Sequence, residues 1–228
     1  MKRIVSTLIV FALTLTALVS SCASEPTNSP SAPAETLDFS DAALFGKPFD
    51  EVENELLKSG VEITTVDSHG QSEFVEQSTS FGLELNKTLD FDIKREILYG
   101  ISYRYVWRYD EHSNEETADF YETVGEIRDS LAAQFGDAKT PDAPVEEKRT
   151  IADLVEQAQT QGFAGGADIA YLDIWVDENP VQAASDTIAE LESADGEDCC
   201  IAVRMDVERL GDEAAVLQIT YRISRDLF

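Results

Sequence analysis

Side chains that commonly carry out chemistry are scarce in this chain, apart from carboxylates. Its 228 residues include 2 histidines and 3 cysteines against 45 aspartates and glutamates. A catalytic triad or a zinc site would ordinarily need a histidine with suitably spaced partners. His69 lies in the turn-like Asp67-Ser68-His69-Gly70, His112 lies beside a predicted helix start, and neither belongs to such a motif. We therefore interpret both as exposed loop residues and predict no catalytic, cofactor-binding or metal-binding residue and no cofactor.

Two short segments resemble ligand-binding loops only in composition. Asp195-Gly196-Glu197-Asp198 lacks the spaced ligands and the terminal glutamate of an EF-hand calcium loop. Gly162-Phe163-Ala164-Gly165-Gly166 is not followed by the Lys-Ser/Thr pair of a phosphate-binding loop. We interpret the glycine-rich segment as a flexible connection into a strand.

The adjacent cysteines Cys199 and Cys200 do not have the spacing of a CxxC redox or zinc motif. A disulfide between neighbouring residues closes only a strained ring. We therefore predict two free thiols at the start of a strand, one buried and one partly exposed. The alternative is a redox-sensitive vicinal disulfide.

The most informative constellation is an alternating strand over residues 99–109. Tyr99, Ile101, Tyr103, Tyr105, Trp107 and Tyr109 share one face by their spacing. We expect this face to pack beneath a helix. The opposite face presents Arg104 and Arg108, which are unusual cations in so acidic a protein. They could pair with local acids or hold an acidic ligand, so we take them as a candidate interaction surface.

Net charge limits the choice of partner. The chain has 17 basic and 45 acidic residues, a formal charge of −28. Nucleic acid is a poor partner, because binding it requires basic residues that neutralise phosphates. Anionic lipid headgroups are disfavoured for the same reason. A cationic peptide, a basic envelope protein or divalent ions are electrostatically plausible. The alternative is that the acidity only keeps the protein soluble.

The N-terminal residues have the order of an export signal. Lys2 and Arg3 precede an apolar run over residues 4–19, and the small residues Ser20 and Ser21 follow it. The run is shorter than the ~20 residues that span a bilayer comfortably. This order predicts export of the remaining chain.

Val19-Ser20-Ser21-Cys22 resembles the lipobox of bacterial lipoproteins. The resemblance implies lipidation of Cys22, removal of residues 1–21, and an extracytoplasmic protein anchored to the cell membrane or the outer membrane. Two or more acyl chains give stable anchoring. The alternatives are an uncleaved membrane helix and an ordinary secretory signal with a chance cysteine.

A tether and a folded part should follow. Prolines and small polar residues dominate the segment after Cys22, so residues 22–36 are predicted to be a disordered tether. Residues 37–228 are long enough to bury a core without disulfides or metal. They are predicted to form one extracytoplasmic domain, with halves 37–110 and 111–228 as a further subdivision.

Periodicity and capping signals predict the elements. A helix should begin at Pro48, which suits the first helical position, and end at Gly60. A longer helix should run from a capping box at Ser113 to Gly136. Strands are predicted at 61–66, 73–81, 83–93, 99–109, 167–176, 199–207 and 217–223. A helix is predicted at 146–161, and either a short helix or a mobile insertion at 180–191.

This order predicts an α+β fold with an antiparallel sheet and helices packed on one face. It also suggests two degenerate helix-then-sheet repeats. The arrangement resembles the beta-lactamase inhibitor proteins and the outer-membrane assembly lipoproteins. We expect a non-enzymatic, membrane-anchored binding or protein-interaction module of the cell envelope. The alternatives are a metal-dependent hydrolase that uses carboxylates and a calcium-responsive structural lipoprotein.

Overall fold

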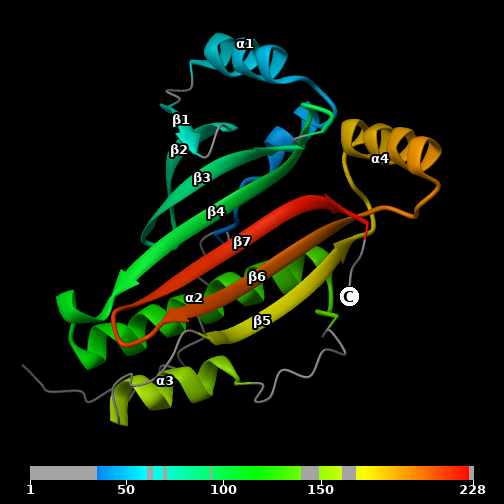
Figure 1. Ribbon diagram of the computed structural model, residues 1–228. Coiled ribbons are helices and arrows are strands. Elements are labelled where there is room, and N and C mark those ends of the chain that lie inside the picture. Colours follow the sequence, from blue (N-terminus) through cyan, green and yellow to red (C-terminus); the bar gives the residue numbers. More distant parts are fainter. Residues whose placement is uncertain are drawn as a thin grey trace, which may run out of the picture. The chain divides into compact units, whose positions relative to one another are not determined.

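The computed structural model describes residues 35–60, 64–68, 71–92, 94–139, 149–160 and 168–225, without the side chains of 64–68 and 71–75. Within them, seven strands form one sheet in the order β1-β2-β3-β4-β7-β6-β5 (Figure 1). The strands are β1 (Thr64–Ser68), β2 (Gln71–Ser80), β3 (Leu83–Phe91), β4 (Leu98–Arg108), β5 (Asp168–Asp177), β6 (Cys200–Leu210) and β7 (Ala214–Ser224).

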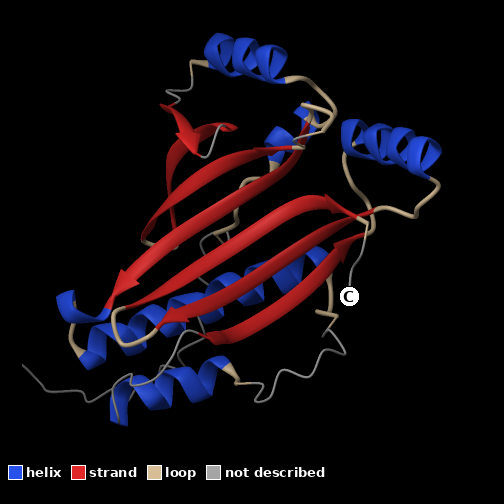
Figure 2. Ribbon diagram, viewed as in Figure 1, coloured by secondary structure: helices blue, strands red, loops and turns tan. Residues whose placement is uncertain are grey.

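Every neighbouring pair of these strands is antiparallel. The helices in the described residues are η1 (Ser40–Leu44), α1 (Phe49–Ser59), η2 (Tyr109–Glu111), α2 (Asn114–Phe135), α3 (Ile151–Thr160) and α4 (Gln182–Asp195). The mixture confirms the predicted α+β class with an antiparallel sheet (Figure 2). None of these helices is long and apolar enough to cross a membrane.

The sheet joins two runs of strands. β1 to β4 follow one another as neighbours, and β5 lies beside β6, which forms a hairpin with β7. The two runs meet where β4 pairs with β7 over nine residue pairs, from Gly100↔Arg222 to Arg108↔Ala214. Strands that are distant in the sequence therefore form the centre of the sheet.

One face of the sheet, here called the inner face, packs against α2 (Figure 1). α2 begins at the predicted capping box, in which Ser113 and Glu116 each accept a hydrogen bond from the other's backbone amide. Phe120 of α2 stacks on Trp107 with ring centroids 4.9 Å apart. The predicted packing of the aromatic strand beneath a helix is thus present.

The chain before α1 covers another part of the inner face. Leu37 and Phe39 are buried there, and the Phe39 ring stacks on Tyr221 with centroids 4.9 Å apart. The side chain of Tyr103 donates a hydrogen bond to the carbonyl oxygen of Asp38. The side chain of Glu35 accepts a hydrogen bond from the backbone amide of Phe81.

A buried lysine holds this N-terminal segment in place. Lys87 of β3 points to the inner face with its side chain only 8% exposed, and its Nζ lies 2.6 Å from Asp41 Oδ2 and 3.7 Å from Glu76 Oε2. The neighbouring inward residues of β3, Leu85 and Leu89, are also buried. A lysine is almost never this buried unless it is paired, so the ion pair fixes η1 against the sheet.

Two predicted elements differ from the structure. Residues 182–195 form helix α4, so the alternative of a mobile insertion at 180–191 is wrong for that stretch. The predicted helix at 146–161 begins only at Ile151, because Thr150 and Asp153 form a cap in which each side chain accepts the other's backbone amide. Residues 146–148 lie outside the described residues.

Candidate functional site

The second face of the sheet, here called the outer face, carries the predicted interaction surface. In Figure 1 the strands β3 to β7 lie in front of α2, and no described helix lies in front of them. Side chains alternate between the faces of a strand, which places a second set of residues outward. The central ones are Asn86, Thr88, Ser102, Arg104, Val106, Arg204, Asp206, Val216, Gln218 and Thr220.

Arg104 lies at the centre of the outer face. Its register neighbours are Asn86 on β3 and Gln218 on β7, which are both uncharged. The side chain is exposed and has no ion pair within the described residues. An arginine without a carboxylate partner is unexpected in a chain with 45 acidic residues. This guanidinium keeps all five of its N–H donors for a ligand or solvent.

The other outer-face arginines are already engaged. Arg204 Nε donates to Asp206 Oδ1 at 2.8 Å. Arg108 lies at the strand end, 3.9 Å from Glu111. Arg222 lies beside Gly100, where an added Cβ would come within 2.9 Å of the Arg222 Cβ. Arg104 and Arg108, predicted together, therefore have different surroundings.

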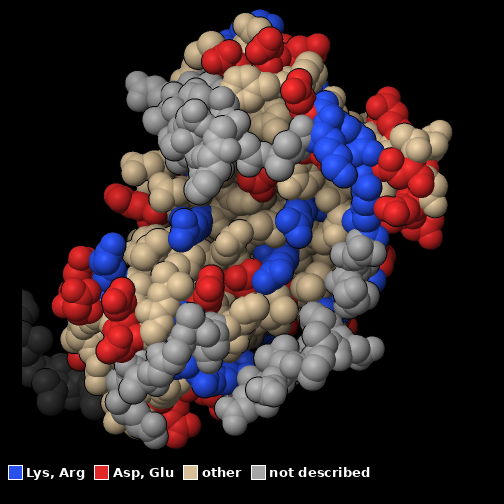
Figure 3. Space-filling model, viewed as in Figure 1, with Lys and Arg blue, Asp and Glu red and all other residues tan. Residues whose placement is uncertain are grey.

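Acidic side chains are distributed differently from the arginines of the outer face. In Figure 3, which views the outer face, they gather over α1 and α4, whereas several basic side chains lie over the sheet. α1 and α4 contribute this acidity through Asp50, Glu51, Glu53, Glu55, Asp186, Glu190, Glu192 and Asp195. The outer face is thus much less acidic than the composition alone implies.

Thr220 adds an unsatisfied polar group to the outer face. It lies between Ser102 and Arg204 in register, and its Oγ1 is buried without a hydrogen-bond partner. The neighbouring Ser102 hydroxyl is engaged, since it donates to Asp90. A buried hydroxyl without a hydrogen-bond partner costs free energy, but because Oγ1 is fully buried it is not accessible to a ligand on the outer face.

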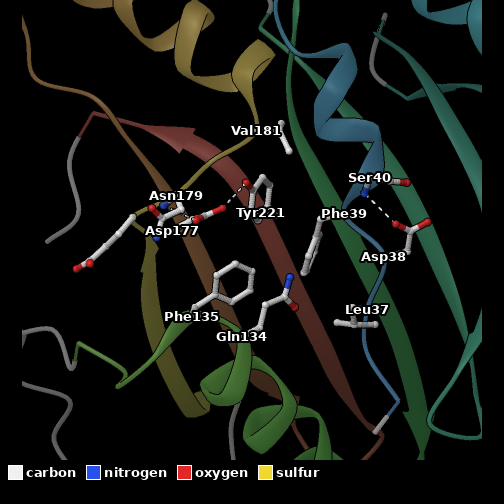
Figure 4. Close-up of a pocket in the computed structure, with 11 residues that line it drawn as sticks. Leu37, Asp38, Phe39, Ser40, Gln134, Phe135, Asp177, Asn179, Val181 and Tyr221 are labelled. Carbon is white, nitrogen blue, oxygen red and sulfur yellow. Dashed lines mark hydrogen bonds between the residues drawn. The ribbon is translucent and has the colours of Figure 1, made fainter. Parts of the chain in front are cut away.

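A pocket opens on the inner face, where four separate parts of the chain meet (Figure 4). It has a volume of about 590 Å³, within the range typical of small-ligand sites. Its lining residues are Leu37, Asp38, Phe39, Ser40, Gln134, Phe135, Asp177, Glu178, Asn179, Val181 and Tyr221. We call this site the aromatic pocket.

Aromatic rings and carboxylates dominate the aromatic pocket. Phe39, Phe135 and Tyr221 lie with their ring centroids 4.9 to 6.1 Å apart. Asp177 Oδ2 accepts a hydrogen bond from the Tyr221 hydroxyl at 2.7 Å. Its Oδ1 accepts one from the backbone amide of Asn179 at 2.9 Å. Burial, the hydrogen bond to Asp177 and the charge of Asp177 raise the pKa of Tyr221, so this hydroxyl stays a donor.

The Asp38 carboxylate points away from the three rings (Figure 4). Partial burial alone would raise its pKa, but the amide and side chain of Ser40 and the charge of Lys87 outweigh burial and hold the pKa below its ordinary value. Asp38 therefore contributes negative charge beside the pocket rather than a group directed into it.

Three other residues considered from the sequence, His112, Cys199 and Cys200, are partly buried. His112 is half-buried rather than exposed, because its ring stacks on Trp107 with centroids 3.7 Å apart. Cys199 and Cys200 are both free and both half-buried, and burial raises the pKa of each thiol. A raised pKa lowers the fraction of reactive thiolate.

The acidic end of α4 is paired with arginines. Asp195 Oδ2 lies 2.5 Å from Arg95 and 2.6 Å from Arg225. Among the residues that the structure describes, no group of three or more histidines, cysteines or carboxylates is arranged to hold a metal. The hydrolase and calcium-responsive alternatives stay predictions.

Several predicted features lie outside the described residues. These are Cys22, His69 and the glycine-rich segment 162–166. Reasoning from sequence also missed Thr220 and the aromatic pocket. The pocket had no local signal, since its rings come from residues 39, 135 and 221.

Comparison of the chain with protein-family models, with characterised proteins and with solved structures gives no match. The resemblances to bacterial lipoproteins, to beta-lactamase inhibitor proteins and to outer-membrane assembly lipoproteins therefore stay predictions, and the surfaces described above carry the functional argument.

Proposed function

We propose that this protein is a non-enzymatic binding module of the cell envelope, which recognises an acidic segment of a partner protein through its outer face. The observation that carries the proposal is Arg104, an exposed guanidinium at the centre of the sheet with uncharged neighbours on both sides. A guanidinium pairs with a carboxylate through two parallel hydrogen bonds. A partner carboxylate would supply the acidic group that none of the described residues places there.

The surroundings of Arg104 favour a protein segment as the partner. Asn86 and Gln218 offer amide groups on either side. Val106 next to them is 40% exposed and offers apolar contact. Arginine is enriched in protein interfaces and among the residues that contribute most to their affinity.

We further propose that lipid on Cys22 anchors the protein outside the cytoplasm. The support is the sequence Val19-Ser20-Ser21-Cys22 after an apolar run. Labelling cells with an alkyne fatty acid should mark the protein, and Cys22→Ser should lose the label and leave the membrane fraction. A labelled Cys22→Ser protein would contradict this anchor.

Photo-crosslinking in the producing cells tests the outer face. A photoreactive amino acid at Asn86 or Val106 of the full-length protein should capture one discrete partner. The same amino acid at Glu126, which is exposed on α2, should not. Arg104→Glu should reduce capture by about tenfold or more, corresponding to the loss of about 1.4 kcal/mol or more.

Arg108→Glu is the matched control, because it makes the same change in charge at an arginine that already lies near Glu111. Its effect should be clearly smaller. Once the partner is identified, exchanging its contacting acid for arginine should restore capture by Arg104→Glu. Equal capture by wild type and Arg104→Glu would remove this arginine from the recognition surface.

A further inference from the structure

We propose that the aromatic pocket is a second binding site, independent of the outer face, and that it takes an ammonium or guanidinium group carried on an apolar stem. The pocket lies on the inner face, so its occupant need not share contacts with the partner of Arg104. Its charge preference is also opposite. Three of its lining residues are acidic, and none of the described lining residues is basic.

Asp177 is the group that would bind the cation. Figure 4 shows its carboxylate directed toward Tyr221, at the inner end of the pocket. The carboxylate accepts hydrogen bonds from Tyr221 and Asn179. It has no basic partner among the described residues. A carboxylate offers about four lone-pair positions, so it can also accept N–H donors from a ligand.

The rings explain why the ligand should be an organic cation rather than a bare metal ion. Phe39 and Phe135 lie with their centroids 6.1 Å apart, and each lies within 6.1 Å of Tyr221. Phe135 is only half-buried, so part of its ring faces the pocket. Aromatic faces attract cations and also bury an apolar stem. Leu37 and Val181 add apolar surface for that stem.

The hydrogen bond from Tyr221 fixes the orientation of the site. Because burial and Asp177 raise the pKa of Tyr221, its hydroxyl keeps donating to Asp177 across the neutral pH range. Asp177 is therefore held before the ligand enters. A preoriented carboxylate spends less binding free energy on ordering its side chain.

Saturation-transfer NMR on the full-length protein in detergent provides the test. The probes are N-acetyl-lysine methylamide and N-acetyl-arginine methylamide, with uncharged N-acetyl-norleucine methylamide as the control. Both cationic probes should bind and the norleucine probe should not. Cadaverine and agmatine, which carry the same cations without a peptide backbone, distinguish a free amine from a peptide side chain as the natural source.

Two substitutions separate the site from general negative charge. Asp177→Asn retains an acceptor for Tyr221 and should weaken binding of the cationic probes by about tenfold. Glu126→Gln removes the same charge from an exposed position on α2 outside the pocket lining, and its effect should be about twofold or less. Thermal melting checks that both variants fold.

Phe135→Leu tests the aromatic contribution, because it keeps an apolar side chain and removes the ring. It should weaken the cationic probes several-fold. Equal signals from the charged and uncharged probes, or unchanged affinity in folded Asp177→Asn, would overturn the proposal. Neither result would affect the outer face, since crosslinking at Asn86 measures that surface separately.

Discussion

The outer face and the aromatic pocket share one strand but present opposite chemistry. On β7, Thr220 points to the outer face between Ser102 and Arg204, and the next residue, Tyr221, points to the pocket. The outer face centres on a guanidinium with uncharged neighbours, whereas the pocket centres on a carboxylate with aromatic neighbours. Because consecutive side chains of a strand alternate, a single strand can serve two sites that attract ligands of opposite charge.

The two sites also differ in how they are built. The outer face is formed only by side chains of the paired strands β3, β4, β7 and β6, which lie side by side. The pocket needs the segment at Leu37–Ser40 to be held against the sheet beside α2. Changes that release this segment should therefore affect the pocket and spare the outer face.

Lys87→Met should give the largest effect. It retains the aliphatic length but leaves Asp41, with its side chain 20% exposed, without its cation. Breaking a buried pair from one side costs about 3–5 kcal/mol. Urea unfolding should show this loss, and cationic probes should bind the folded fraction more weakly. The control is Lys58→Met, whose exposed pair with Glu55 should matter by less than about 1 kcal/mol. A small effect of Lys87→Met would mean that other contacts hold η1.

Gly100→Ala should disturb the outer face alone. An added Cβ would lie 2.9 Å from the Arg222 Cβ and 3.3 Å from Asp90 Oδ2. Such overpacking typically costs about 1–3 kcal/mol. Capture of the outer-face partner should fall, while binding to the aromatic pocket is retained. Gly125→Ala is the opposite control, because it has only ordinary contact with Ile151 and should stabilise α2 by about 0.5–1 kcal/mol. Equal stability of Gly100→Ala and wild type would show that Arg222 moves freely.

Thr220→Val should separate stability from binding. Valine has nearly the same shape and removes a buried hydroxyl that has no partner, so the protein should gain about 1 kcal/mol. Partner capture by the outer face should be unchanged, because this hydroxyl is buried. Thr117→Val should instead be destabilising, because the Thr117 hydroxyl donates to Ser113 and accepts from Trp107. Weaker capture by Thr220→Val would show that its hydroxyl becomes accessible to the partner.

Asp206→Asn should give the smallest effect, and the effect should depend on pH. Burial raises the pKa of Asp206, although Arg204 opposes the shift. The protonated form is therefore favoured by folding. This stabilisation is complete below the unfolded pKa, about 3.9, and is lost as the pH rises through the higher folded pKa.

The stability of Asp206→Asn relative to wild type should consequently increase with pH across this interval. Unfolding experiments at several pH values measure the trend. Removing one negative charge from the outer face should also favour an acidic partner, with no change at the pocket. A relative stability that decreases with pH would contradict the role of burial.

Local signals in the sequence predicted several elements well. The capping box at Ser113, the alternation through Tyr103 and Trp107, and the glycine after Phe135 depend on neighbouring residues, and the structure confirms them. The outward position of Arg104 followed from the same alternation. Lys87 had an equally local signal, because it shares a period of two with Leu85 and Leu89. Its inward position was nevertheless not predicted, because a lysine is ordinarily expected to be exposed.

Pairings between distant residues were not predictable in this way. Nothing near β4 indicates that β7, rather than β5, lies beside it. The aromatic pocket depends on that pairing and on the path of residues 37–40. Whether Arg104 has an acidic partner among the described residues depends on which residues become its neighbours. Alternation could therefore predict the face on which Arg104 lies but not its lack of an ion pair there.

The pairing of β4 with β7 has a consequence for how the chain folds. β7 is the last strand in the sequence, so β4 remains an unpaired edge throughout synthesis until residues 214–224 are available. Contacts between distant segments form slowly because a long loop must close first. An open edge strand can meanwhile pair with another chain. The vulnerable species is therefore the nascent protein that lacks its final strand, and truncation before Ala214 should favour aggregation far more than removal of any surface helix.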